Sequence, residues 1–381
     1  MLRSTDRILT THTGSLPRPS DLADLLYAAE GGTLSDEAAF RARVNAAVAE
    51  SVSKQVEVGL DVVNDGEMGK VSYATYVNGR LTGYESQQHV PRAPRADTAD
   101  FPEYAAWYAK QQPASYALKR FACTGPVRYV GHEKLHNEIE NLKAARIEAG
   151  GSQAGEGFMT AASPGVISVF QPNQFYGSND EYVLALADAM REEYEAIHQA
   201  GFLLQIDCPD FTGLTSGMGT RPADLSLRVE ALNRATVSIP PEAMRLHLCL
   251  GNYEGPHHLD TPLELIIEDV LQARPAAFSF EGANPRHEHE WNVFERVKLP
   301  ADKVIIPGVI DSTTNYIEHP ELVAQRLERY AQLVGREQVI AGADCGFGTF
   351  AGGELVHPAI VFAKLAAMVE GAKIASARLW G

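Results

Sequence analysis

Short apolar stretches alternate with longer amphipathic stretches along this chain. Eight apolar stretches have the length and the composition that favour β-strands. They cover residues 8–13, 60–67, 157–162, 202–207, 244–250, 277–281, 304–311 and 339–345. Helical spacing of apolar residues covers residues 36–58, 180–200, 261–273 and 319–333. Strands that alternate with helices indicate a parallel sheet, and eight of them favour a (β/α)₈ TIM barrel of the α/β class.

An open, doubly wound sheet is the alternative architecture. A Gly-x-Gly-x-x-Gly turn after the first strand would favour it, but the chain has Gly14-Ser15-Leu16-Pro17 there. We therefore expect one barrel domain over residues 1–381. Residues 70–156 are too many for an ordinary connection between the second and third strands. We expect this segment to be an insertion that covers the barrel or packs against it.

Composition and charge exclude several classes of protein. The 381 residues are 45% hydrophobic and 22% charged, which is typical of a globular protein. A net charge of −16 argues against sequence-independent nucleic-acid binding, which needs a basic face. Neither a membrane span nor an apolar signal core is visible, so we expect a cytoplasmic protein. Four cysteines are too few for a disulfide scaffold, and homo-oligomerisation is left open.

Polar or reactive residues end nearly every predicted strand. They are Ser15, Glu67, Ser163, Asp207, His247 with Cys249, Glu281, Asp311, and Asp344 with Cys345. In a β/α barrel the carboxyl ends of the strands converge on the active site. Charged groups at the ends of apolar strands are costly unless they are paired or bind something. This pattern predicts an active site at the carboxyl end of the barrel.

Four of these residues have the chemistry of a metal site. His247 and Cys249 lie two positions apart, so they project from the same face of a strand. A His-x-Cys pair alone is common and is more often fortuitous than a metal site. Cys345 and Glu281, at the ends of two other strands, add a second thiolate and a carboxylate. An imidazole, two thiolates and a carboxylate suit tetrahedral zinc.

Taken together, these motifs resemble the C-terminal catalytic barrel of the cobalamin-independent methionine synthase family. The resemblance implies that His247, Cys249, Glu281 and Cys345 hold zinc, which binds a substrate thiol and activates it for alkylation. It runs along essentially the whole chain in family order. The matching pieces are Thr11-His12-Thr13-Gly14-Ser15-Leu16-Pro17, Asp65-Gly66-Glu67, Gln205-Ile206-Asp207, His247-Leu248-Cys249, Phe280-Glu281, Gly308-Val309-Ile310-Asp311 and Asp344-Cys345-Gly346.

The same resemblance implies an amino-acid pocket. In the family, the positions of Gly14, Ser15, Glu67 and Asp207 bind homocysteine. Glu67 and Asp207 have the charge that an ammonium group requires. Glu281 is a further candidate catalytic group, since a carboxylate is the most labile of the four ligands and we expect it to yield its place to the substrate thiol.

The chain also departs from the family pattern. It contains one barrel, whereas the two-barrel enzyme uses an additional N-terminal barrel to help bind polyglutamylated folate. A histidine that is thought to deliver a proton to the leaving folate is replaced by Asp311-Ser312-Thr313-Thr314-Asn315. Asp311 or His287 is then the candidate acid. The segment 281–291 is either a solvated loop and the start of a helix, or a segment in which Arg286 or His287 contacts an anionic group.

We expect a zinc-dependent thiol alkyltransferase, and methyl transfer to homocysteine to give methionine is the preferred reaction. The enzyme would then be an S-methyltransferase like the 5-methyltetrahydropteroyltriglutamate–homocysteine enzyme. Its partners would be a small-molecule thiol and an alkyl donor: a folate, methylcobalamin or a corrinoid protein, or an epoxide. Alkyl transfer or lyase chemistry on another thiol, as in epoxyalkane:coenzyme M transferases, is the alternative. A non-catalytic zinc-binding paralogue is the alternative from another class.

Overall fold

The computed structural model describes residues 1–87, 96–111, 120–151, 155–213 and 219–381. The strands are β1 (Leu9–Thr10), β2 (Val62–Val63), β3 (Tyr84–Gln87), β4 (Arg120–Cys123), β5 (Glu156–Ala162), β6 (Leu203–Asp207), β7 (Met244–His247), β8 (Ala277–Phe280), β9 (Val304–Ile310) and β10 (Ile340–Ala343). The α-helices are α1 (Ser20–Gly31), α2 (Glu37–Glu57), α3 (Ala96–Ala99), α4 (Pro102–Gln111), α5 (His132–Glu148), α6 (Pro164–Phe170), α7 (Asn179–Gln199), α8 (Leu225–Ala235), α9 (Ile267–Gln272), α10 (Pro320–Val334) and α11 (Pro358–Trp380). Short 3₁₀ helices cover Tyr76–Gly79, Pro209–Thr212, Pro241–Ala243, Leu263–Leu265, Glu288–Glu295 and Arg336–Gln338.

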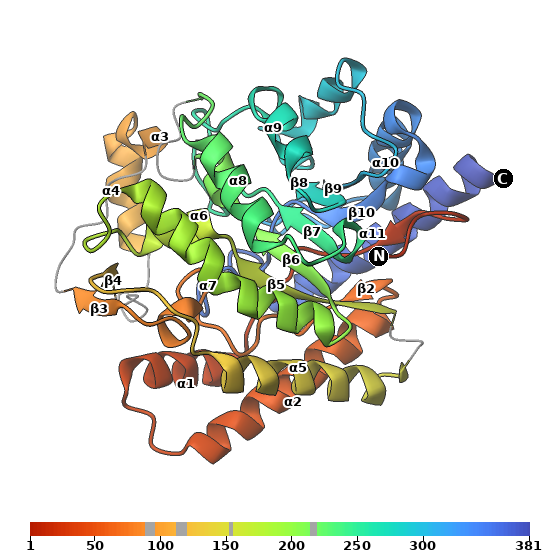
Figure 1. The fold of residues 1–381 in the computed structure, drawn as a ribbon. Helices are drawn as coiled ribbons and strands as arrows, with labels where there is room; N and C mark the ends of the chain where they lie inside the picture. The colour runs from red at the N-terminus through yellow and green to blue at the C-terminus, as the bar shows by residue number, and fades with distance from the viewer. Residues whose placement is uncertain (88–95, 112–119, 152–154, 214–218) are drawn as a thin grey trace.

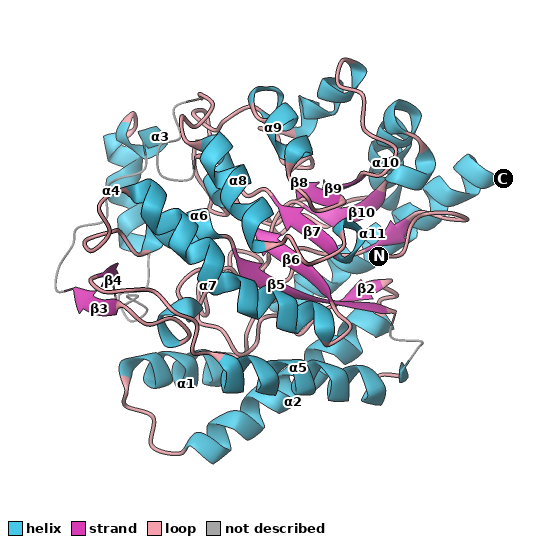
Figure 2. Cartoon of the chain, viewed as in Figure 1, coloured by secondary structure: helices cyan, strands magenta, loops and turns pink. Residues whose placement is uncertain are grey.

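Eight strands form one parallel sheet in the order β1-β10-β9-β8-β7-β6-β5-β2. The first and last strands of this order meet, because Asp61 N–H donates to the Thr10 carbonyl (3.1 Å) and Thr11 Oγ1 donates to the Val62 carbonyl (3.2 Å). The sheet therefore curves into a nearly closed barrel with helices around it, as Figures 1 and 2 show. The (β/α)₈ prediction is confirmed, and the open doubly wound alternative is wrong.

Local sequence explains where the outer helices begin. Asp36 caps α2 by accepting hydrogen bonds from the backbone N–H groups of Ala38 and Ala39, and Ser178 caps α7 by accepting one from Glu181. The predicted helix over 261–273 is shorter in the structure, with a 3₁₀ turn and then α9. Ile266 between them has φ −124°, which interrupts the helix.

The segment between β2 and β5 contains additional structure beyond the barrel. β3 and β4 form a small antiparallel sheet, and α5 packs beside α2 in the outer layer (Figure 1). Helices α3 and α4 dock on the loop after β7, where Tyr253 OH donates to Asp97 and His258 pairs with Asp100. Residues 88–95, 112–119 and 152–154 of the predicted insertion lie outside the described residues. The assignment of 1–381 as one domain with an insertion at 70–156 stays a prediction.

The barrel core is apolar along the strands and polar at their carboxyl ends. All seven residues of β9, for example, are buried. The polar residues at or just after the strand ends, including Asp207, Cys249, Glu281, Asp311 and Cys345, are buried as well. Among the described residues, no helix combines the length and the apolar character needed to cross a membrane.

Candidate metal centre and substrate pocket

Three of the four predicted metal ligands meet at the carboxyl end of the barrel. One ligand atom each from His247, Cys249 and Cys345 lies within 4.8 Å of the others, and all three side chains are buried. The two sulfur atoms are 3.5 Å apart. Zinc–sulfur bonds of about 2.3 Å in a tetrahedral site place two thiolates about 3.8 Å apart, so the pair fits a metal of this size with little movement.

The imidazole of His247 presents one nitrogen to this cluster. Its Nδ1 atom lies 3.2 Å from Ser279 Oγ, whereas Nε2 is buried without a hydrogen-bond partner among the described residues. A buried polar atom without a partner is rare unless it binds something. Ser279 orients the ring, as the outer partners of metal-binding histidines commonly do.

The two thiols are electrostatically coupled. The hydrogen bond from Cys345 lowers the pKa of the Cys249 thiol well below its usual value, and the ring of His247 lowers it further. The interaction with Cys249 and burial raise the pKa of Cys345. The two buried thiols oppose each other's ionisation, and a bound cation would stabilise both as thiolates.

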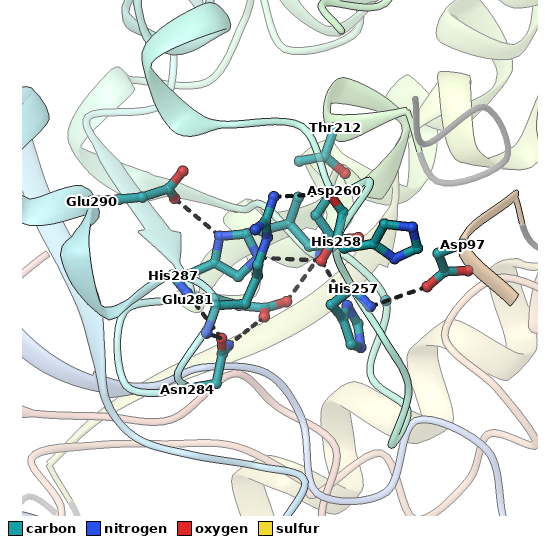
Figure 3. A network of polar contacts seen from close by, with 12 residues as sticks. Asp97, Thr212, His257, His258, Asp260, Glu281, Asn284, His287 and Glu290 are labelled. Atoms are coloured by element: carbon teal, nitrogen blue, oxygen red, sulfur yellow. Dashed lines mark hydrogen bonds and ion pairs between the residues drawn. The ribbon is translucent and has the colours of Figure 1, made fainter. Parts of the chain in front are cut away.

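Glu281, the fourth predicted ligand, lies beside the cluster but is not among its three members. Its Oε1 atom accepts a hydrogen bond from Leu250 N–H (3.0 Å), and Oε2 accepts one from Asn284 Nδ2 (2.8 Å; Figure 3). Burial raises its pKa well above the usual value, and the charge of Cys249 adds to this effect. The carboxylate therefore has a hydrogen-bonded position of its own next to the two thiols.

Asp344 connects the two metal-site loops and was not assigned a role from the sequence. Its carboxylate accepts hydrogen bonds from the backbone N–H groups of Gly282, Ala283 and Asn284, each at 2.8 Å. Because it precedes Cys345, it fixes the loop that follows Glu281 relative to that cysteine. The position of Asp344 at the strand end before Cys345 was the available signal, but its partners lie 60 to 62 residues away in the sequence.

His287 is buried, so the expectation that it lies in a solvated loop is wrong, although a 3₁₀ helix does begin within the segment 281–291, at Glu288. Its Nδ1 atom lies 3.1 Å from Glu290 and its Nε2 atom 3.2 Å from Asp260, as Figure 3 shows. Although burial lowers the pKa of His287, the hydrogen bonds to these two carboxylates raise it to about 10. The ring is a fixed cation near Glu281, and its anionic contacts come from this chain.

Gly14 and Ser15 bring the loop after β1 against the other pocket residues. Gly14 has φ +135°, and a Cβ atom there would lie 3.3 Å from Glu67 Oε1 and 2.6 Å from a methyl group of Thr160. Only glycine allows this approach. The side chain of Ser15 lies against Gly346, since a Cβ atom on that glycine would be 2.0 Å from Ser15 Oγ.

Glu67 is held in a strained conformation. Its φ of +57° lies in the left-handed region, which costs a residue other than glycine roughly 1–3 kcal/mol. Thr160 Oγ1 donates to its Oε1 atom (2.8 Å), while Oε2 is buried and has no hydrogen-bond partner in the part of the chain that the structure describes. Such strain persists where the surroundings fix a side chain for a purpose.

Asp207 lies at the end of β6, close enough to Glu67 to sense its charge. Burial raises the pKa of Asp207 well above the usual range, and the negative charge of Glu67 raises it further. Gln205 Nε2 donates to one of its oxygens (2.8 Å). Gln205 and Thr160 were not predicted, although Gln205 shares a strand face with Asp207. The two buried carboxyl groups lie in one acidic pocket beside Cys249, where the charge of Lys70 offsets part of this rise in pKa.

Asp311 has both carboxylate oxygens occupied. Oδ1 accepts hydrogen bonds from the backbone and hydroxyl groups of Thr313, each at 2.9 Å. Oδ2 accepts from the backbone and hydroxyl groups of Thr314, at 3.0 and 2.6 Å. In this arrangement Asp311 orders the loop after β9 and would have to exchange a donor in order to act as an acid.

Comparison with known proteins identifies related chains of similar length. Residues 166–374 match the model of a family described as cobalamin-independent synthase, catalytic domain. A methionine synthase of Thermococcus kodakarensis is 24% identical over 366 residues, which cover 96% of this chain and 92% of that protein. A methionine synthase of Saccharolobus islandicus is 26% identical over 369 residues, which cover 96% and 94%.

Two solved structures share the fold. A B12-independent methionine synthase from Shewanella sp. W3-18-1, in complex with selenomethionine, has a TM-score of 0.73 at 19% identity and covers 98% of this chain and 99% of its own. A putative vitamin-B12 independent methionine synthase from Listeria monocytogenes has a TM-score of 0.65 at 21% identity, with the same coverage of both chains. The overall fold of this chain is therefore found in other proteins.

Proposed function

Because the chain belongs to the cobalamin-independent synthase family, we propose that it is a zinc-dependent S-methyltransferase that methylates homocysteine to give methionine. The observation that carries this proposal is the position of the buried His247–Cys249–Cys345 cluster next to the anionic pocket of Glu67 and Asp207. A thiol to be alkylated and an ammonium group to be recognised would then bind side by side. The names of the two curated relatives agree with this reaction.

The donor set fits zinc better than other common metals. Two thiolates and an imidazole are soft to borderline ligands, and the nearby carboxylate is a hard ligand that zinc also accepts. Calcium and magnesium prefer sites made of oxygen ligands alone. Bound zinc would hold the acceptor sulfur as a thiolate at neutral pH. Glu281 would complete the set, and as the most labile ligand it would be the one that the acceptor thiol replaces. Leu250 N–H and Asn284 supply the hydrogen bonds that hold the carboxylate afterwards.

The pocket residues have separate tasks in this proposal. Glu67 and Asp207 bind the ammonium group of the acceptor, and one partner cation allows both buried carboxylates to be ionised. Backbone groups of Gly14 and Ser15 contact the acceptor at the end of β1. His287 supplies a fixed positive charge that offsets the anionic ligand set near Glu281.

The methyl donor is one whose leaving group needs no acid positioned after β9. Thr313 and Thr314 occupy that loop, and their hydroxyl groups are committed to Asp311. A missing general acid costs roughly 10²–10⁴ in rate when the leaving group must be protonated. We therefore propose that methylcobalamin, free or on a corrinoid protein, is a better donor than polyglutamylated methylfolate.

The test is a donor and acceptor matrix with the metal-loaded protein. Homocysteine and coenzyme M serve as acceptors, and methylfolate polyglutamate, methylcobalamin and a small epoxide serve as donors. We expect methionine from homocysteine and methylcobalamin. If product forms only from coenzyme M and the epoxide, alkylation of another thiol replaces homocysteine methylation as the proposed function. If turnover with methylfolate matches that of a two-barrel enzyme, the proposed preference for methylcobalamin is wrong.

A further inference from the structure

We propose that Arg18 is a positioning residue that makes the pocket selective for thiols bearing an ammonium group. It acts through Glu67, and the inference rests on the proposed function. Arg18 lies in Leu16-Pro17-Arg18-Pro19, directly after the Gly14-Ser15 loop. Its side chain is fully buried, which is unusual for arginine and demands specific partners.

The guanidinium group joins three loops at the carboxyl end of the barrel. Its Nε atom donates to the backbone carbonyl of Glu67 (3.1 Å), and Nη1 donates to the carbonyl of Gly348, which follows Cys345 by three residues. Gly348 is required for this approach, because a Cβ atom there would lie 3.0 Å from Arg18 Nη1 and 2.5 Å from the Leu16 carbonyl oxygen. The arginine therefore connects Glu67, the proposed substrate-binding residue, to the loop that follows Cys345.

Arg18 also fixes the orientation of the Glu67 side chain. Its Nη2 atom lies 3.6 Å from Glu67 Oε2, close enough for electrostatic attraction but beyond hydrogen-bond distance. Both atoms are buried and lack hydrogen-bond partners within the described ranges. The carbonyl contact from Nε and the Thr160 contact to Oε1 hold the residue in its left-handed conformation. The open hydrogen-bonding capacity of Oε2 remains for a ligand.

An ammonium donor is the group that this oxygen accepts best. Asp207 lies close enough to Glu67 to interact with its charge, so an ammonium group at Oε2 can contact two carboxyl groups. The charges of Arg18 and Lys70 offset part of this negative charge. The adjacent thiol cluster sets where the sulfur of the same ligand lies. Lysine in place of Arg18 would keep the positive charge but could not contact two carbonyls and a carboxylate through a planar fork. Replacement of Arg18 should therefore weaken recognition of the ammonium group and leave the contact to the substrate thiol unchanged.

The experiment measures binding of three thiols to the metal-loaded protein by calorimetry. Homocysteine carries both an ammonium and a carboxylate, 4-mercaptobutanoate lacks the ammonium, and 3-mercaptopropylamine lacks the carboxylate. We expect Arg18→Lys to weaken the two ammonium-bearing thiols by about tenfold and to leave 4-mercaptobutanoate nearly unchanged. Arg18→Gln is the second variant, should the first fail to fold. Arg80→Lys, another buried arginine paired with carboxylates, is the matched control.

Equal weakening of all three thiols, or the same loss in Arg80→Lys, would reduce Arg18 to a structural role and overturn the proposal. Selective loss of 4-mercaptobutanoate binding would also overturn it, because Arg18 would then contact the substrate carboxylate directly. A double-mutant cycle with Glu67→Gln should give less than additive effects. If Glu67→Gln is itself silent, the proposed pocket fails together with Arg18. If only Arg18→Lys is silent, the pocket survives.

Discussion

Acidification should destabilise the folded protein through His12, which holds the loop after β1. Its Nδ1 atom accepts a hydrogen bond from Gly14 N–H (3.2 Å), and Nε2 lies 2.8 Å from Gln55 Oε1. That same oxygen accepts from the backbone N–H of Asn64 (2.9 Å), so it is an acceptor and His12 Nε2 carries the proton. The folded state therefore requires the neutral imidazole, because protonation of Nδ1 would break the contact to Gly14.

The size of the effect follows from the pKa difference between the two states. Burial lowers the pKa of His12 to about 4, and the charge of Arg245 acts in the same direction. In the unfolded chain the pKa is about 6.5, so the unfolded state binds more protons between these values. Stability is complete above pH 6.5 and is lost as the pH falls. The loss is about 2 kcal/mol at pH 5 and about 3 kcal/mol near pH 4.

Urea denaturation of the wild type and His12→Asn between pH 4.5 and 7.5 measures this effect. Asparagine keeps an acceptor near the position of Nδ1 but does not titrate. Other buried groups respond to pH with the opposite sign, since burial raises the pKa of Asp65 to about 6, so the difference between the two proteins is the informative quantity. We expect the wild type to lose about 2 kcal/mol more than the variant on going from pH 7.5 to pH 5. Parallel pH profiles would refute the neutral, buried imidazole.

Three further predictions concern the site. Cys345→Ser should lose most of the bound metal while Cys208→Ser, a change at another buried cysteine, retains it; full metal content in both by elemental analysis would contradict the ligand assignment. Asp207→Asn should weaken homocysteine binding by about tenfold with normal metal content, and unchanged affinity would exclude the ammonium contact. Gly308→Ala would place a Cβ atom 2.0 Å from Asp344 Oδ1. The free energy of unfolding, measured by urea denaturation, should therefore fall by about 3 kcal/mol. A fall below about 1 kcal/mol would show that Asp344 moves easily.

The order of strands and helices in the barrel, and the types of residue at the carboxyl ends of its strands, could be predicted from the sequence. Strand-like runs separated by helical spacing define the parallel sheet, since each parallel strand needs a crossover. The spacing of His247 and Cys249 places both on one strand face, because side chains alternate along a strand. The helix over 261–273 was predicted too long, since the break at Ile266 arises where a 3₁₀ turn meets α9.

Tertiary structure alone decided which of these groups touch and in what state they are. The 3.5 Å separation of Cys249 and Cys345 joins residues 96 positions apart, and no local pattern encodes such a distance. Arg18 gives no periodic signal, yet it is buried against Glu67 and Gly348 because three loops converge there. Glu281 was predicted from its type, but its hydrogen bonds to Leu250 and Asn284 depend on the loop that Asp344 fixes. Burial and neighbouring charges set the hydrogen bonds and the protonation of a group, and both depend on how distant segments pack.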